Sequence, residues 1–418
     1  MLTVKQAFAL KEMCSGKNVF LTGDAGTGKS YTIDKFLEQC EKDNKQVVVC
    51  APTGIAAINI GGVTIHRAFG LSPKPLIETP KAIPSILKEA DTLLIDEISF
   101  CRVDLFDYIS KVLFALNKIR RKNGDSDIQV IVVGDFFQLP PVLIPKDREI
   151  LEKYKYGHDL RNAFAFQSEY WSTYRFVSIQ LDEVVRQNDN EFIANLNGMR
   201  HGDYKSIKYF NNKCNKQSIE GAITICGTNK AVDKKNQIEY NKIQAKEKVY
   251  KATEVGNVLE SDKMVPSELR LKVGCRVMIV MNDPTLRYQN GTLATVTKLG
   301  SDSVTVLTDD GSIVRIERYT WDIHNYTTSQ TKGKIKLKMG SVGKYTQFPI
   351  KLAYAVTVHK SQGQTFDKVN LDPYCWDCGQ LYVALSRVRT IQGLHLIQPI
   401  DTRYLITSKD VINFYRNL

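Results

Sequence analysis

The stretch GDAGTGKS, residues 23 to 30, decides the fold of this chain. It matches the pattern G-x-x-x-x-G-K-[ST], in which glycines let the backbone curl so that its N–H groups point inward. The β-rich run NVFLTG precedes it, and YTIDKFLEQCEK, which has helical spacing, follows it. A strand, a glycine loop and a helix in this order predict a phosphate-binding loop within a parallel α/β sheet.

The residues of this loop have distinct predicted tasks. Lys29 would place a cation against the β- and γ-phosphates of a nucleotide, and the Ser30 hydroxyl would ligate Mg²⁺. Asp24 is unexpected, because a carboxylate near phosphates costs energy unless it points away. ATP and Mg are therefore the expected cofactors. The predicted ATP-binding residues of the loop are Gly23, Ala25, Gly26, Thr27, Gly28, Lys29 and Ser30.

Two later strands are expected to bring polar groups to the same sheet edge. LLIDEIS, residues 93 to 99, ends a buried strand with Asp96 and Glu97, at the carboxyl end where α/β sheets place ligands. Asp96 suits the Mg²⁺ shell, and Glu97 suits a general base acting on water. Residues 130 to 142, VIVVGDFFQLPPV, end a third strand with Gln138. Its amide would contact the γ-phosphate and orient water. The alternative is an amide that only hydrogen-bonds the backbone of its own loop.

The rest of the chain predicts a second α/β set and an all-β region. After Arg175, FVSIQL, a helical run and AITIC open the second set. Residues 273–348 are mostly short strands with Asn-Gly and Asp-Gly turn signals. Strand and helix patterns return from KLAYAVTV to the end. Residues 71–84 carry four prolines and predict an irregular loop or small insert.

Bulk composition narrows the function classes. The chain has 418 residues and a net charge of +12, which favours an anionic partner such as nucleic acid. We find no transmembrane run and no secretion signal, so an intracellular location, cytoplasm or nucleoid, is expected. The nine cysteines are scattered. Cys375 and Cys378 form a CxxC, but no second pair stands nearby to complete a zinc site.

Further motifs follow in order along nearly the whole chain. LTVKQ stands near the start, APTGIAAINIGGVTIHRAFG at 51 to 70, and LDEVVRQND at 181 to 189. VTVHKSQGQTFDKV follows at 356 to 369 and YVALSRVR at 382 to 389. Together with the loop, DEIS and GDFFQLPPV, these motifs resemble those of the petite-integration-frequency (PIF) DNA helicases of superfamily 1B, relatives of the RecD-type helicases. One departure is Phe100 after DEIS, where methionine is expected.

The resemblance implies an architecture and an activity. The architecture is two RecA-like domains with ATP between them, and the activity is 5′-to-3′ translocation on single-stranded DNA with duplex unwinding. The implied partners are single-stranded DNA and forked or partial-duplex DNA, and a monomer is expected. The expected division is domain 1 at 1–70 and 85–174, a wedge insert at 71–84, domain 2 at 175–290 and 349–418, and a Src-homology-3-like barrel at 291–348.

The resemblance also assigns roles to single residues. Gln6 would read adenine, and Gly363 and Gln364 join the predicted ATP-binding residues. Arg186 and Arg387 would complete the catalytic site from domain 2, because guanidinium groups stabilise charge on a transferring phosphate. The predicted DNA-binding residues are Pro52, Thr53, Gly54, His66, Thr357, His359 and Lys360.

Two alternatives remain open at this point. An ATP-gated nucleic-acid clamp or remodeller, which switches without unwinding, fits the same site chemistry. A small-molecule P-loop kinase needs only one phosphate-loop domain and a lid, and it leaves residues 175–418 unexplained.

Overall fold

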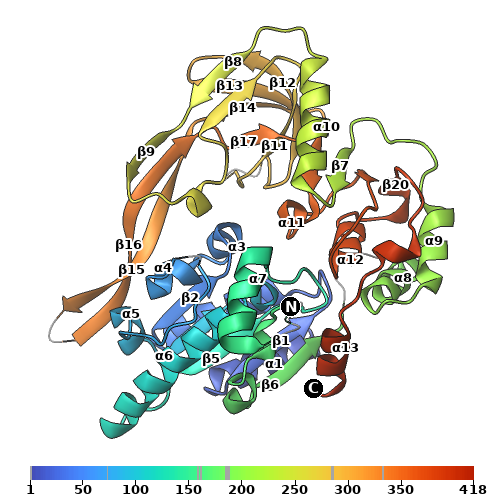
Figure 1. Ribbon diagram of the computed structural model, residues 1–418. Helices are drawn as coiled ribbons and strands as arrows, with labels where there is room; N and C mark the ends of the chain where they lie inside the picture. The colour runs from blue at the N-terminus through green and yellow to red at the C-terminus, as the bar shows by residue number, and fades with distance from the viewer. Residues whose placement is uncertain are drawn as a thin grey trace. The chain divides into compact units, whose positions relative to one another are not determined.

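The structure is a computed structural model, and it describes residues 2–72, 74–157, 160, 162–183, 189–283, 287–331 and 334–418. The chain forms two compact units (Figure 1). Unit 1 holds Met1–Arg186, His324–Gly340 and Lys409–Leu418, and unit 2 holds Gln187–Ile323 and Ser341–Ser408. Within the described part of the chain, no helix has both the length and the apolar character needed to cross a membrane.

Unit 1 is built on a six-stranded sheet in the order β3-β2-β4-β5-β1-β6. Each neighbouring pair is parallel. Apolar runs such as VIVV in β5 are buried along their whole length, as expected for a sheet covered on both faces. The strands are β1 (Val19–Gly23), β2 (Val47–Ala51), β3 (Val63–Thr64), β4 (Thr92–Ile95), β5 (Gln129–Val133) and β6 (Val177–Leu181).

Helices cover this sheet and start at recognisable caps. Thr3 and Gln6 form a capping box at the first turn of α1 (Val4–Cys14). Ile33 and Phe36 of α2 (Lys29–Lys42) share a buried core with Ala9, Met13 and strands β1 and β5. The other helices of unit 1 are α3 (Gly54–Asn59), α4 (Ile65–Phe69), α5 (Ser85–Lys88), α6 (Val103–Lys122), α7 (Pro145–Leu151) and α13 (Lys409–Arg416).

The edge strand β6 lies elsewhere than the sequence suggested. We expected FVSIQL to open the second α/β set, but β6 pairs with β1 in the first sheet. Ile179 and Leu181 of β6 join the core beneath α1 and α2. Sequence patterns identify a strand but not its partner, because pairing depends on residues far apart in the chain.

Unit 2 contains a smaller parallel sheet in the order β18-β7-β19-β20. Its strands are β7 (Ile223–Cys226), β18 (Ala355–Thr357), β19 (Val369–Leu371) and β20 (Leu394–Leu396). The helices of this unit are α8 (Asn190–Arg200), α9 (Lys205–Lys213), α10 (Asn229–Asn241), α11 (Val358–Ser361) and α12 (Gln380–Leu385). The fold class is therefore α/β with parallel sheets.

Unit 2 also contains a five-stranded antiparallel sheet in the order β14-β13-β12-β11-β17. Its strands are β11 (Arg276–Ile279), β12 (Leu293–Leu299), β13 (Ser303–Thr308), β14 (Ile313–Glu317) and β17 (Ile350–Leu352). They share one core with β8 (Lys248–Lys251) and β10 (Glu268–Leu271), and α10 adds Tyr240 to it. The sheet thus takes β11 and β17 from outside the segment 291–348.

Two more segments complete the arrangement. The strands β15 (Tyr319–Thr331) and β16 (Lys334–Gln347) form a sheet with β9 (Thr253–Gly256), and residues 324–340 group with unit 1. The Tyr326 hydroxyl accepts a hydrogen bond of 3.0 Å from Val49 N on β2. Tyr326 also lines a cavity of about 770 Å³ together with residues of the proline-containing segment, among them Leu76 and Ile83. The proline-containing segment 71–84 contains no helix or strand among its described residues.

Candidate functional site

The loop from Gly23 to Ser30 joins β1 to α2. Gly26 and Gly28 have φ values of 86° and 80°, the left-handed region that favours glycine. The Lys29 ammonium lies over the loop and donates to Gly23 O at 2.9 Å and to Asp24 O at 3.1 Å. Ser30 is exposed in the first turn of α2. The loop therefore presents a cation and a hydroxyl at a helix N-terminus, the arrangement that binds phosphate groups.

Gln6 contacts the same loop from α1. Its Nε2 donates to Thr27 O at 3.0 Å, while its Oε1 accepts from Thr3 N at 3.0 Å. A Cβ on Gly28 would lie 2.5 Å from this Nε2, so the amide packs directly over a position that has to be glycine. Gln6 is thus part of the nucleotide loop's support.

Asp96 and Glu97 follow β4, as the sequence predicted. The Glu97 backbone is left-handed, with φ 50° and ψ 47°, a conformation that costs energy in a residue with a side chain and that gathers at functional sites. Asp96 Oδ1 accepts from Glu97 N at 2.8 Å. Burial and the neighbouring Glu97 charge raise the Asp96 pKa, and Lys29 acts in the opposite direction. Lys29 and Asp96 are therefore close enough to interact.

Gln138 follows β5 in a buried turn. Its Nε2 donates to Asp135 Oδ2 at 3.4 Å, and Phe137 N donates to Asp135 Oδ1 at 3.1 Å. Gly134 has φ 154°, and a Cβ there would lie 3.0 Å from Ile98 N, so this turn packs against the one that follows Glu97. Strands β4, β5 and β1 are neighbours, and their carboxyl ends bring these groups together.

Tyr415 of α13 is a member of this site that the sequence did not reveal. Its hydroxyl lies 2.6 Å from Thr22 Oγ1 and accepts from Phe136 N at 3.2 Å. Phe137 stacks on the Tyr415 ring, with ring centroids 4.8 Å apart. The only available signal was the aromatic pair in NFYRNL, which carries no motif. The chain's last helix thus holds the turn that carries Gln138.

Three of the four DNA-contact residues predicted for unit 1 line one cavity of about 300 Å³. Pro52, Thr53 and His66 line it, together with apolar residues such as Val142 and Ile144. Thr53 caps α3, which begins at Gly54. Burial, followed by the positive charge of Arg102, lowers the His66 pKa. The imidazole is therefore neutral at neutral pH and suited to hydrogen bonding or stacking.

The first of the DNA-contact residues predicted for unit 2 is Thr357. The buried Thr357 hydroxyl accepts from Lys360 N at 3.2 Å and caps the short helix α11. Lys360 itself is exposed, and burial lowers the His359 pKa. Gly363 follows with φ 77°. The segment thus displays one exposed cation beside a capped helix start.

Arg387 is buried and contacts backbone carbonyls of its own unit. Its side chain is 2% exposed, Nε donates to Val383 O at 2.8 Å, and Nη1 donates to Gln364 O at 3.3 Å. Gln364 Oε1 is buried without a hydrogen-bond partner among the described residues. Arg186, the second predicted arginine, lies outside the described residues.

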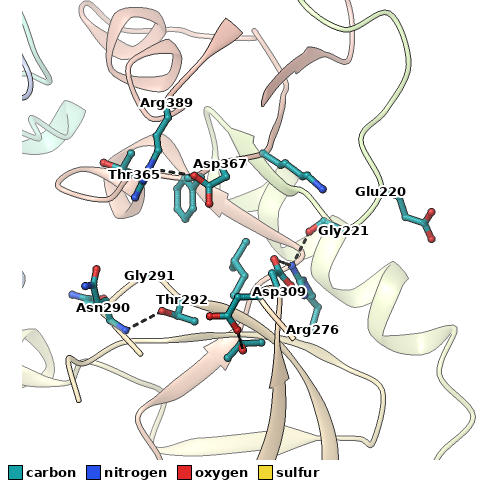
Figure 2. Close-up of a pocket in the computed structure, with 16 residues that line it drawn as sticks. Glu220, Gly221, Arg276, Asn290, Gly291, Thr292, Asp309, Thr365, Asp367 and Arg389 are labelled. Carbon is teal, nitrogen blue, oxygen red and sulfur yellow. Dashed lines mark hydrogen bonds and ion pairs between the residues drawn. The ribbon is translucent and has the colours of Figure 1, made fainter. Parts of the chain in front are cut away.

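Unit 2 also contains a polar cavity of about 530 Å³ (Figure 2). Arg276 is ion-paired with Asp309 on one side of it, and Arg389 lies 3.2 Å from Asp367 on the other. Gly291 forms part of the lining and stands beside the Gln364 side chain. Because its charged groups are largely paired with one another, this cavity does not present a single charge to a ligand.

These features define a nucleoside-triphosphate-binding protein of the P-loop α/β class. A family model for PIF1-like helicases matches residues 1–210. The chain is 32% identical to the ATP-dependent DNA helicase Pif1 of Bdellovibrio bacteriovorus, over 99% of this chain and 92% of that protein. It is 30% identical to the ATP-dependent DNA helicase PIF1 of Homo sapiens, over 100% of this chain and 64% of the human protein.

Solved structures agree with the sequence comparisons. The crystal structure of Bacteroides sp. Pif1 in complex with ADP-AlF4 superposes with a TM-score of 0.84 at 34% identity, covering 100% of this chain and 97% of that one. The chain therefore belongs to the PIF1-like helicase family, which confirms the resemblance inferred from its motifs.

Proposed function

We propose that this protein is an ATP-dependent DNA helicase that translocates 5′-to-3′ on single-stranded DNA and unwinds duplexes. The observation that carries the proposal is the convergence of Lys29, Asp96, Glu97 and Gln138 at the carboxyl ends of three neighbouring strands. The relatives named as DNA helicases support the nucleic-acid substrate. The 5′-to-3′ direction rests on the family resemblance.

Mg²⁺ is the proposed metal cofactor, held by Ser30 and Asp96. Both offer hard oxygen ligands, which Mg²⁺ prefers, and the metal would neutralise charge on the phosphates. The residues fit a cation, because Asp96 lies beside the Glu97 carboxylate in a desolvated place that raises its pKa. A positive ion there would relieve this repulsion.

The remaining groups have separate proposed tasks. Glu97 accepts the proton of the attacking water, and Gln138 orients that water. Gln6 contacts the adenine end of the nucleotide, and Gly363 and Gln364 join the binding site from unit 2. Arg387 and Arg186 stabilise charge on the transferring phosphate, so that ATP hydrolysis alters how the two units grip DNA.

The proposed partners are single-stranded DNA and forked or partial-duplex DNA, bound by a monomer inside the cell. Pro52, Thr53, Gly54 and His66 would hold the strand in unit 1. Thr357, His359 and Lys360 would hold it in unit 2, because hydroxyl groups, backbone amides and lysines bind phosphate oxygens without reading sequence.

Strand displacement separates this proposal from the ATP-gated clamp. Duplexes with a 5′ tail, a 3′ tail or no tail are incubated with ATP and Mg²⁺, and Glu97→Gln provides the hydrolysis-deficient control. We expect displacement of the 5′-tailed duplex alone and ATPase activity stimulated by single-stranded DNA. DNA-stimulated ATPase without displacement would favour the clamp, and ATPase indifferent to DNA would exclude both.

A further inference from the structure

Helix α13 is fixed to unit 1 by its aromatic side chains. Phe414 stacks on Phe166 with ring centroids 4.4 Å apart, and it meets the Phe136 ring edge-on at 5.5 Å. Val411, one turn earlier, is buried. A helix of 8 residues is not stable by itself, so these contacts determine where it lies. They also determine where the next residue, Tyr415, places its hydroxyl group.

The Tyr415 hydroxyl joins the ends of two strands of the parallel sheet. It lies 2.6 Å from Thr22 Oγ1 on β1, just before Gly23 of the phosphate loop. It also accepts from Phe136 N at 3.2 Å and lies 3.5 Å from Asp135 Oδ1. One hydroxyl group therefore contacts both the strand that enters the phosphate loop and the turn that follows β5.

Asp135 connects this hydroxyl to Gln138. The carboxylate is buried, and its two oxygens bind different groups. Oδ1 accepts from Phe137 N at 3.1 Å, and Oδ2 accepts from Gln138 Nε2 at 3.4 Å. A carboxylate only accepts hydrogen bonds, so the Gln138 amide has to turn its NH2 group toward Asp135 and its carbonyl oxygen away from it. The position of Asp135 thus determines the orientation of the Gln138 amide.

Packing alone does not require a hydroxyl group at this position. The Tyr415 ring stacks on Phe137 with centroids 4.8 Å apart, and a phenylalanine would make the same contact. The hydroxyl adds contacts to Thr22, Phe136 and Asp135, each of which adjoins a segment of the proposed ATP site. Hydrogen bonds fix distance and direction more narrowly than ring contacts do. The hydroxyl therefore suits a positioning role.

We propose that Tyr415 is a positioning residue for ATP hydrolysis, which holds the turn from Asp135 to Gln138 against β1 and so orients the Gln138 amide. The inference rests on the proposed function, in which Gln138 orients the attacking water. Tyr415 acts through Asp135 and needs no contact with the nucleotide. A group that is already oriented lowers the barrier, because no reorganisation is needed in the transition state. The last helix of the chain is thereby part of the hydrolytic machinery.

The effect of Tyr415 should appear in kcat rather than in substrate affinity. Tyr415→Phe keeps the ring contacts and removes the hydroxyl, so the Gln138 amide loses its fixed orientation while the helix remains docked. We expect kcat to fall about threefold, the rate equivalent of one weak hydrogen bond. The KM for ATP and the half-saturating DNA concentration should keep their wild-type values, because Lys29 and the DNA contacts are unchanged.

A double-mutant cycle tests whether Tyr415 acts through Gln138. Single-turnover hydrolysis of radiolabelled ATP at saturating oligothymidylate is measured for the wild type, Tyr415→Phe, Gln138→Ala and the double variant. Rates are normalised to the sites titrated with a fluorescent ATP analogue, so that unfolded protein does not count. Tyr415→Phe should be slower than the wild type. The double variant should hydrolyse ATP at the rate of Gln138→Ala, because no amide is left to orient.

Tyr156→Phe is the matched control for lost stability. The Tyr156 hydroxyl donates to Asp107 Oδ2 at 2.6 Å, a hydrogen bond within unit 1 that involves no residue of the Gln138 turn. Its removal should lower the free energy of unfolding, as in Tyr415→Phe. The rate of hydrolysis per folded molecule should stay at the wild-type value.

A wild-type rate of hydrolysis by Tyr415→Phe would overturn the proposal. An equal loss in the wild-type and Gln138→Ala backgrounds would also overturn it, because the hydroxyl would then act on another group, such as the phosphate loop through Thr22. An equal loss in Tyr156→Phe would reduce Tyr415 to a structural role. If Gln138→Ala itself hydrolyses ATP normally, the task of Gln138 in the proposed function fails, and this inference fails with it.

Discussion

The phosphate loop of unit 1 and the segment around α11 of unit 2 hold their cations in different ways. Lys29 rests on two carbonyl oxygens of its own loop, and Arg387 is similarly enclosed by the Val383 and Gln364 carbonyls. Lys360 is exposed, and its ammonium has no such partner among the described contacts. A cation held by carbonyls has one fixed position, which suits a ligand of defined geometry such as a nucleotide.

The exposed Lys360 suits a different ligand. A moving DNA strand presents successive phosphates at variable positions, and point charges on flexible stems can follow them. We therefore expect the carbonyl-held cations to set the rate of ATP hydrolysis and Lys360 to contribute to the affinity for DNA.

The largest expected effect is that of Lys29→Ala. Removing the cation that faces the β- and γ-phosphates should abolish hydrolysis, while single-strand binding survives because the DNA contacts are intact. Phosphate release and DNA anisotropy measured on the same preparation would show both outcomes. Turnover near the wild-type rate would refute the phosphate site.

Arg387→Ala should lower the maximal rate of ATP hydrolysis about a thousandfold if the side chain acts as an arginine finger. ATP affinity should remain largely in place, because the loop and Gln6 are unchanged. Arg387→Lys should not rescue fully, since an ammonium cannot make the planar fork. Binding of a fluorescent ATP analogue and turnover at saturating DNA distinguish the two effects. A large loss of nucleotide affinity with normal turnover would argue against the finger.

Lys360→Ala should have a smaller and different effect. It should raise the DNA concentration needed for half-maximal stimulation and leave more of the maximal ATPase rate, because the missing charge is a DNA contact. The salt slope of binding should fall by about 0.7. An unchanged slope would remove Lys360 from the DNA contacts.

Tyr415→Phe should give the smallest effect on activity and a measurable effect on stability. It leaves the Phe136 N–H without its acceptor, so the free energy of unfolding should fall by about 1–3 kcal/mol. Urea unfolding followed by circular dichroism measures this change. Tyr204→Phe is the matched control, because Tyr204 is 59% exposed. Equal stability of the two variants would contradict the role assigned to Tyr415.

Local patterns predicted the parts of the site that are formed locally. The glycine loop, DEIS after β4 and Gln138 after β5 lie where their motifs placed them, because each is a short run whose backbone geometry its own residues determine. The parallel α/β class followed from strands alternating with helices. These features need no knowledge of distant contacts.

The features that the sequence missed depend on distant contacts. Tyr415 reaches Thr22 across 393 residues of sequence, and β6 joins β1 rather than opening unit 2. No spacing rule connects residues so far apart.

The central claim is that Arg387 determines the rate of ATP hydrolysis and Lys360 the affinity for DNA. Steady-state ATPase activity titrated with single-stranded DNA tests it most directly. The wild type, Arg387→Ala and Lys360→Ala are measured side by side. The account predicts that Arg387→Ala lowers the plateau and leaves the half-saturating DNA concentration near that of the wild type. It predicts that Lys360→Ala shifts the half-saturating concentration upward and largely retains the plateau. A normal plateau for Arg387→Ala at saturating DNA would contradict the account.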